Sequence, residues 1–340
     1  MHMADALVAP VVAGTMYVAS AGVAGYSIHK VRQEDNQKKI PLMGIMGAFV
    51  FAAQMINFTI PGTGSSGHLC GGMMLSALLG PWAGFLTMIG VLLIQCLFFA
   101  DGGLLALGCN IWNMAFYGCF VGSLLIWRPI MKKGATRLKI ILASIIGCVL
   151  TLQMGAFSVT IETMLSGVTE LPFKTFVAAM QPIHLAIGLV EGLITAAVLL
   201  FVYEARPELL WGVGEETKKE AKLSFGWTLG ILGGLALLIG GALSLVASSL
   251  PDGLEWAIGR ITGSEELEAA EAGIYAAADK VQSTTSFLPD YAFKGSESAA
   301  GTTVSGIVGA LIVVVVMVGS ALLFRYFKGR KKEEAPKAGA

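Results

Sequence analysis

The chain has 340 residues, of which 55% are hydrophobic and only 14% are charged, and its mean hydropathy is +0.73. This is the composition of a protein embedded in membrane lipid, and it excludes a soluble globular core. The formal net charge is zero, so nothing indicates a nucleic-acid partner.

The first predicted element is the N-terminal tripeptide Met1-His2-Met3, which precedes the first apolar run. If the chain begins at Met1, its amine, the backbone nitrogen of His2 and Nδ1 of the His2 ring can close two chelate rings around one metal ion. The three nitrogens would leave one corner of a square open for another imidazole. Square-planar nitrogen ligands suit Ni(II) and Cu(II), and the ligands must lose protons to bind. Because most lone histidines are not ligands, the rest of the chain has to support this hypothesis.

Apolar runs of about 20 residues, the length that crosses a bilayer as a helix, fall at roughly 9–28, 40–59, 81–100, 104–127, 139–165, 176–203, 226–247 and 303–324. A shorter run at 69–79 would be about 16 Å long as a helix. It stops at Gly80-Pro81, a helix-breaking pair. We expect a short or re-entrant helix there, with its irregular ends buried in protein. The predicted fold class is an all-α membrane protein.

The distribution of lysine and arginine predicts the orientation of these helices. If the N-terminus lies outside and all nine segments cross, 19 of the 23 basic residues fall in the inside pieces 29–39, 128–139, 204–225 and 325–340. Cytoplasmic loops carry such an excess of positive charge. We therefore predict an outside N-terminus and a cytoplasmic C-terminus. The N-terminal segment lacks the basic start of a signal peptide, so we expect it to remain as a helix.

This topology places the loop 60–68 on the same outer side as the N-terminus, so His68 and the tripeptide can meet although they are far apart in sequence. Three glycines make the loop compact. Asn57, Ser65 and Ser66 are candidates to orient the His68 ring through hydrogen bonds.

Other polar residues are weaker candidates for a functional role. His29 is expected at the solvated cytoplasmic end of the first helix, whereas His184 and Glu191 lie inside a membrane helix. Intramembrane ionisable residues are functional candidates by default, but a polar pair that holds helices together is at least as good an explanation. Outer helix ends carry further polar groups that could line the site or only cap helices: Gln95, Asp101, Asn110 and Asn113.

Gly44, Ala48 and Ala52 place small residues on one face of the second predicted helix. Such a pattern permits close helix packing. It indicates either packing within the bundle or a docking face for another membrane protein.

The chain divides into a membrane bundle at 1–205, a polar cytoplasmic linker at 206–225, a second module at 226–325 and a basic cytoplasmic tail at 326–340. In the second module two helices bracket an outer loop at 248–302. This loop has nine acidic and three basic residues, which would attract cations but also serve solubility. Helical spacing of its apolar residues predicts an amphipathic helix near 267–281.

These motifs resemble the NikM/CbiM family, the substrate-binding membrane components of nickel and cobalt energy-coupling-factor (ECF) transporters. The resemblance covers residues 1 to about 203 and rests on Met1-His2, Pro61-Gly62-Thr63, Gly67-His68-Leu69, Leu79-Gly80-Pro81-Trp82, Ala100-Asp101-Gly102-Gly103-Leu104, Asn110, Asn113-Met114 and His184-Leu185-Ala186-Ile187-Gly188. The second module resembles the NikN-type PDGLE domain through Pro251-Asp252-Gly253-Leu254-Glu255-Trp256 and Leu288-Pro289-Asp290-Tyr291. The chain thus looks like a fusion of the two components.

The resemblance implies a seven-helix S-component bundle, one helix of which is short, followed by two further transmembrane helices. It also implies that the N-terminal segment reaches into the centre of the bundle. The transported ion would be Ni(II) or Co(II), held by the Met1 amine, the His2 backbone nitrogen, the His2 ring and the His68 ring. Residues 3–6 differ from the commoner family pattern of an apolar residue followed by Pro-Asp-Gly, which leaves the choice between nickel and cobalt open.

By the same resemblance, the chain captures metal for an ATP-driven importer in a bacterial or archaeal cell membrane, and cobalt supply would serve cobalamin synthesis. The sequence has no GxxxxGK[ST] motif in a cytosolic setting. The family therefore implies separate ATPase subunits and a transmembrane coupling subunit, with no cofactor and no catalytic residue in this chain.

Three alternatives stay open at this point. A membrane metalloenzyme would need HExxH or an open coordination position, and HExxH is absent. A structural assembly subunit would bind no metal. A channel is disfavoured because tight chelation slows conduction. For the second module, we expect its deletion to leave metal binding intact but to reduce uptake.

Overall fold

The computed structural model describes residues 1–34, 36, 38–214, 220–265, 267–295 and 298–333, with side chains described through residue 323. Helices occupy each predicted apolar run, which confirms an all-α membrane architecture. Helices long and apolar enough to cross a membrane are, in the described part, α1 (Pro10–Glu34), α4 (Pro81–Phe99), a continuous helix from Leu107 to Met131, α7 (Arg137–Ser166), α8 (Phe173–Ala205) and α12 (Ala299–Glu333). Two shorter apolar helices are α2 (Lys39–Gln54) and α9 (Phe225–Gly241).

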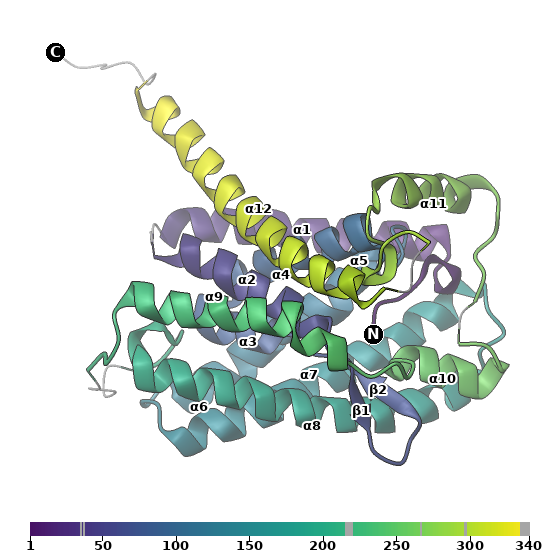
Figure 1. Cartoon of the computed structure of the whole chain (residues 1–340), viewed down its shortest axis with the longest axis horizontal. Coiled ribbons are helices and arrows are strands. Elements are labelled where there is room, and N and C mark those ends of the chain that lie inside the picture. Colours follow the sequence, from purple (N-terminus) through teal and green to yellow (C-terminus); the bar gives the residue numbers. More distant parts are fainter. Residues whose placement is uncertain (35, 37, 215–219, 266, 296–297, 334–340) are drawn as a thin grey trace.

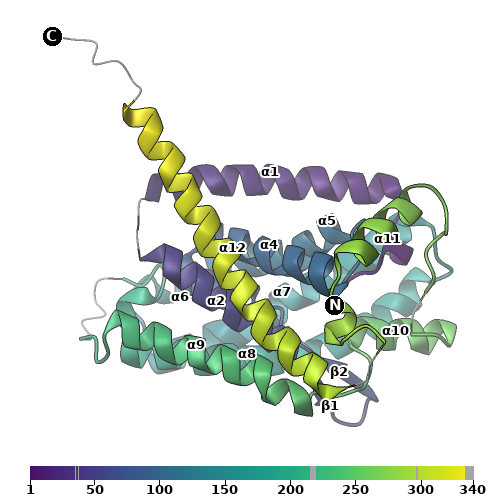
Figure 2. The ribbon, with the colours of Figure 1, turned by 45° about the horizontal axis from the view of Figure 1, so that its top comes forward.

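The continuous helix has three parts: α5 (Leu107–Asn110), the π-helical η2 (Ile111–Trp127) and α6 (Arg128–Met131). Around it α7 and α8 pack against each other, while α2, α9 and α12 form a neighbouring group (Figure 1). In the second view α1 lies along one side of the molecule and α12 crosses the bundle (Figure 2).

The short helix predicted near 69–79 is α3 (Gly72–Leu79), and all of its residues are buried. Left-handed backbone at Gly71 (φ 82°) and an unusual conformation at Gly80 (φ 79°) bound it, and Pro81 then begins α4. A Cβ on Gly71 would lie 2.5 Å from Cγ1 of Val50. Both the backbone angle and the close approach therefore require glycine at this position.

The segment expected as a compact loop is a β-hairpin. Strands β1 (Phe58–Ile60) and β2 (Ser65–Gly67) are antiparallel, with Phe58 opposite Gly67. The preceding helix ends at Gln54, earlier than the predicted boundary at 59. Strands of three residues are too short to show an alternating pattern, so periodicity could not reveal them.

In the second module, α9 is followed by the short turn η4 (Leu243–Val246), by α10 (Gly253–Thr262) and α11 (Gly273–Thr285), and then by the short turn η5 (Pro289–Tyr291). Asp252 and Glu255 form a capping box at the start of α10. Figure 1 shows α10, α11, the hairpin and the N-terminus gathered at one end of the bundle, with the far end of α12 at the other. The short turns η1 (Asp5–Leu7) and η3 (Pro207–Leu209) complete the described elements.

The small-residue face of α2 packs against α12 of the same chain. Gly44, Ala48 and Ala52 are all buried, and a Cβ on Gly44 would lie 2.9 Å from Cγ2 of Val318. Another protein could reach this face only if α12 moved away. Docking of a partner at these residues therefore stays a prediction, and packing within the chain is what the structure contains.

Candidate metal centre

The N-terminal segment is held inside the bundle by Asn110, the last residue of α5. The backbone N–H of Met3 donates to Oδ1 of Asn110 at 2.7 Å, and the Asn110 amide donates back to the Met3 carbonyl at 3.1 Å. Gly103 N–H also donates to that carbonyl. Met1 and Met3 are both buried as a result, so the chain terminus has a fixed place rather than a free end.

The structure brings the Met1 amine and His68 together. Met1 N lies 2.8 Å from Nε2 of His68. Nδ1 of the same ring lies 3.0 Å from the carbonyl oxygen of Leu69, and since a carbonyl only accepts, Nδ1 carries the proton. Nε2 then presents a lone pair toward Met1. The His2 and His68 rings stack with their centroids 5.1 Å apart.

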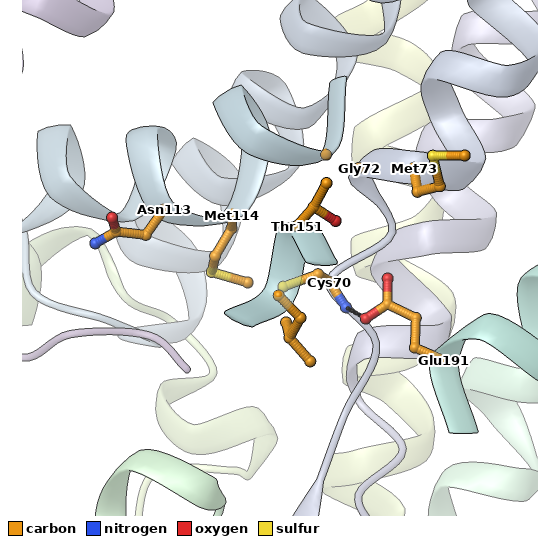
Figure 3. A pocket seen from close by; sticks show the side chains of 9 residues that line it. Cys70, Gly72, Met73, Asn113, Met114, Thr151 and Glu191 are labelled. Atoms are coloured by element: carbon orange, nitrogen blue, oxygen red, sulfur yellow. Dashed lines mark hydrogen bonds between the residues drawn. The ribbon is translucent and has the colours of Figure 1, made fainter. Parts of the chain in front are cut away.

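Glu191 fixes the backbone that follows His68. Its two carboxylate oxygens accept from the N–H groups of Cys70 and Gly71, each at 2.9 Å. Figure 3 shows the bond to Cys70. His184 does not pair with Glu191 as the structural explanation from sequence supposed: its Nδ1 donates to the Met180 carbonyl at 2.8 Å, and its Nε2 is buried without a partner. Glu191 therefore supports the His68 segment directly.

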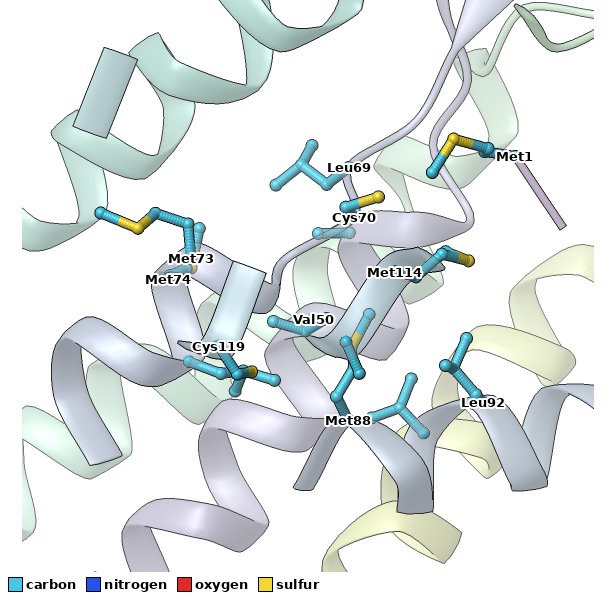
Figure 4. Close-up of a cluster of buried hydrophobic side chains, with 14 of the residues drawn as sticks. Met1, Val50, Leu69, Cys70, Met73, Met74, Met88, Leu92, Met114 and Cys119 are labelled. Atoms are coloured by element: carbon cyan, nitrogen blue, oxygen red, sulfur yellow. The ribbon is translucent and has the colours of Figure 1, made fainter. Parts of the chain in front are cut away.

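A small cavity lies next to Glu191 and Cys70 (Figure 3). Thr151 and Asn113 are among the other residues that line it. The Met1 side chain lies at one edge of a cluster of buried apolar side chains that includes many methionine and cysteine sulfurs (Figure 4). Packing of the Met1 side chain against this core helps to place its amino group.

Asp252 of the second module reaches the same point. Its Oδ2 lies 2.5 Å from the Met1 amine and 3.6 Å from Nε2 of His68. Its Oδ1 accepts from the N–H groups of Leu254 and Glu255 at the start of α10. Sequence reasoning missed this residue. In the sequence it stood out only as part of the PDGLE resemblance, and nothing local indicated a contact across 251 residues.

His2 is held by a second carboxylate. Its Nδ1 lies 3.1 Å from Oδ1 of Asp101, and the Tyr291 hydroxyl donates to Oδ2 of Asp101 at 2.5 Å. Nε2 of His2 is buried without a partner. In this structure the ring nitrogen required for the chelate therefore faces Asp101, and the full nitrogen square is not assembled.

Burial and the nearby carboxylate set the charges of the site. Burial lowers the pKa of the Met1 amine, but the attraction of Asp252 and its hydrogen bond outweigh this, so the pKa is raised above its usual value. Burial alone would raise the pKa of Asp252, yet the charge of the Met1 amine holds it well below its usual range. Burial lowers the pKa of His2 to about 4, so His2 is neutral at physiological pH.

The residues that were expected to orient the His68 ring form hydrogen bonds with other groups. Ser65 and Ser66 donate from their hydroxyls to carbonyl oxygens at 250–251, and the Asn57 carbonyl accepts from the N–H of Ser248 at 2.7 Å. This part of the prediction differs from the structure, in which Leu69 holds the ring. The hairpin uses these polar groups to bind the second module.

Side chains alone do not build a metal centre here: in the part of the chain that the structure describes, no three His, Cys, Asp or Glu side chains are arranged to hold an ion. A centre at Met1 and His68 has to include main-chain nitrogens.

The fold defines a multi-pass membrane protein whose buried N-terminal amine lies beside the His68 ring. The chain belongs to the CbiM family, the cobalt uptake substrate-specific transmembrane region, which matches residues 2–209. Residues 226–326 match the PDGLE domain. Both resemblances expected from the sequence are confirmed.

Relatives support the same assignment. A putative fused nickel transport protein NikMN of Archaeoglobus fulgidus is 37% identical over 316 residues, which cover 93% of this chain and 96% of that protein. A probable fused nickel transport protein LarMN of Lactiplantibacillus plantarum is 29% identical and covers 94% of this chain and 97% of its own length. A crystal structure of a truncated transition metal transporter has 32% identity and a TM-score of 0.53, covering 60% of this chain and 99% of that one. The protein is thus a nickel or cobalt transport component of the CbiM/NikMN type rather than an enzyme.

Proposed function

We propose that this chain is the substrate-capture component of an ATP-driven ECF-type importer for Ni(II), Co(II) or both. The ion is bound by the Met1 amine, the backbone nitrogen and ring of His2, and Nε2 of His68. The proposal requires that the working protein begins at Met1, which an intact-mass measurement tests.

The observation that carries the proposal is the distance of 2.8 Å between Met1 N and Nε2 of His68. Metal–nitrogen bonds are about 2.0 Å long, so two neighbouring corners of a square lie about 2.8 Å apart. The two atoms therefore already stand at the spacing of adjacent ligands. A hydrogen bond of ordinary length has the same spacing, so metal binding by the purified chain distinguishes the two arrangements.

Completion of the square needs two local changes. The ammonium and the His2 amide must lose their protons, as metal ligands do, and Nδ1 of His2 must turn from Asp101 toward the ion. Both changes involve only the first two residues. The framework of α3, α8 and the hairpin stays in place.

Transport is proposed to follow from the predicted topology. The end that gathers the N-terminus, the hairpin and α10 would face outside, with the basic C-terminal tail in the cytoplasm of a bacterial or archaeal cell. Separate ATPase subunits and a transmembrane coupling subunit would reorient the loaded bundle. Separation of His68 from the N-terminal segment would then release the ion inward.

Replacement of His68 tests this function. His68→Ala removes one corner of the square, and we expect at least a 100-fold loss of Ni(II) and Co(II) affinity, measured by competition with a chelator on the purified chain with its native N-terminus. His29→Ala is the control, because His29 is exposed on α1. Equal affinities in the two variants would assign the site to other residues, and a wild-type chain that binds neither ion would favour a structural assembly subunit.

A further inference from the structure

The PDGLE segment is fixed against the hairpin that carries His68. Ser66 N–H donates to the carbonyl of Pro251 at 2.8 Å, and the Trp256 indole donates to the carbonyl of Thr63 at 3.0 Å. A Cβ on Gly253 would lie 2.9 Å from Cδ1 of Ile187 and 3.1 Å from Cε1 of His184, so α10 begins in close contact with α8. Asp252 therefore has a defined position relative to His68.

The two oxygens of Asp252 have separate tasks. Oδ1 caps α10, and Oδ2 contacts the Met1 amine. Because the cap fixes the side chain, the second oxygen is directed at the N-terminus without further loss of side-chain freedom. Met1 is only 4% exposed, so water does not take the place of this partner.

The same module also reaches His2, through Tyr291. The Tyr291 ring stacks on Phe99 with the centroids 5.0 Å apart, its hydroxyl donates to Asp101, and Asp101 contacts Nδ1 of His2. Gln95 donates to the Tyr291 hydroxyl at 3.2 Å. Tyr291 is thus locked by packing and sets the position of the carboxylate beside the His2 ring.

We propose that the outer segment of the second module positions the N-terminal chelate: Asp252 holds the Met1 nitrogen beside His68, and Tyr291 holds Asp101 beside the His2 ring, where it accepts from Nε2–H once Nδ1 has turned to the ion. The inference rests on the proposed metal site. A free N-terminus loses conformational freedom when it wraps an ion, and a terminus that is already ordered loses less of it on binding. Asp252 and Tyr291 are positioning residues in this account, not ligands.

The test uses the full-length chain with its native N-terminus and Ni(II) as the probe. Asp252→Asn keeps a good helix cap but removes the anion, and Tyr291→Phe keeps the ring but removes the hydroxyl. Partners of metal ligands typically contribute about 10–100-fold to affinity. We expect each variant to lower Ni(II) affinity by about tenfold or more, while the absorption spectrum of the metal-saturated protein stays that of the wild type.

Two variants of the same outer loop serve as matched controls. Asp279→Asn makes the same charge change on an exposed residue of α11. Tyr275→Phe removes a hydroxyl that donates to the Val8 carbonyl, away from the ligands. Both are expected to bind Ni(II) as the wild type does. Asp252→Ser is a second replacement, since serine caps the helix but is too short to reach the amine.

Several outcomes would overturn the inference. Unchanged or tighter binding by Asp252→Asn and Asp252→Ser would mean that the carboxylate does not help to assemble the site. A changed spectrum at saturation would make Asp252 a ligand itself. If the wild type binds Ni(II) and His68→Ala does not, yet Asp252 and Tyr291 variants bind normally, only this inference fails. A wild type that binds no metal would instead remove the proposed function.

Discussion

The amino group of Met1 has two competing partners, a proton and a metal ion. Asp252 raises the pKa of this amine, so the metal-free site holds an ammonium–carboxylate pair at neutral pH. A metal ion needs the lone pair that the proton occupies. The contact that orders the terminus therefore also weakens metal binding, because the amine must lose its proton before it can bind the ion.

This competition predicts that Ni(II) affinity rises with pH. A group with a raised pKa keeps its proton to higher pH, and the His2 amide must lose one as well, so each rise in pH removes a competitor. We expect affinity to increase steadily from about pH 6 to pH 9, measured by chelator competition at fixed ionic strength. His2 itself contributes little to this slope, because its pKa of about 4 leaves it neutral throughout. An affinity independent of pH would contradict the ammonium as the resting state of the site.

At the scale of elements, α8 supports the site from within the membrane. Glu191 accepts from two successive N–H groups just after His68, so a single side chain fixes the direction in which the chain enters α3. The alternative from sequence, a His184–Glu191 pair, fails because each residue bonds to backbone on its own.

Glu191→Gln tests this support. A glutamine offers one oxygen where the carboxylate offers two, so one buried N–H would lose its partner at a cost of about 1–3 kcal/mol. We expect a lower thermal unfolding temperature and weaker Ni(II) binding together. Glu170→Gln is the control, since Glu170 is exposed beyond α7. Unchanged binding in Glu191→Gln would show that the His68 backbone is held by other contacts.

The length of the apolar runs predicted the membrane helices well, because a helix needs about 20 apolar residues to cross a bilayer. The predicted helix boundaries were less accurate. The second helix was predicted to extend to residue 59, whereas α2 ends at Gln54 and β1 begins at Phe58. The predicted topology also placed Met1 and His68 on the same side of the membrane. The role of Asp252 was out of reach, because a contact between the first residue and one 251 positions later leaves no local pattern.

At the scale of the whole molecule, the two modules meet at the site. The first supplies Met1, His2 and His68, and the second supplies Asp252 and Tyr291. The sequence alone predicted that removal of 226–340 leaves metal binding intact, whereas the role proposed for Asp252 predicts that binding becomes weaker. In the fused chain α12 also covers the small-residue face of α2, so any partner that docks there must first displace this helix.

The central claim is that the free amine of the chain is itself a ligand, and one added residue tests it most directly. An alanine placed before Met1 converts the amine into an amide and leaves His68 and all later residues unchanged. The account predicts that the extended protein, offered Ni(II) and Co(II) together, loses high-affinity binding and the absorption spectrum of the native protein. Undiminished affinity with an unaltered spectrum would contradict the claim.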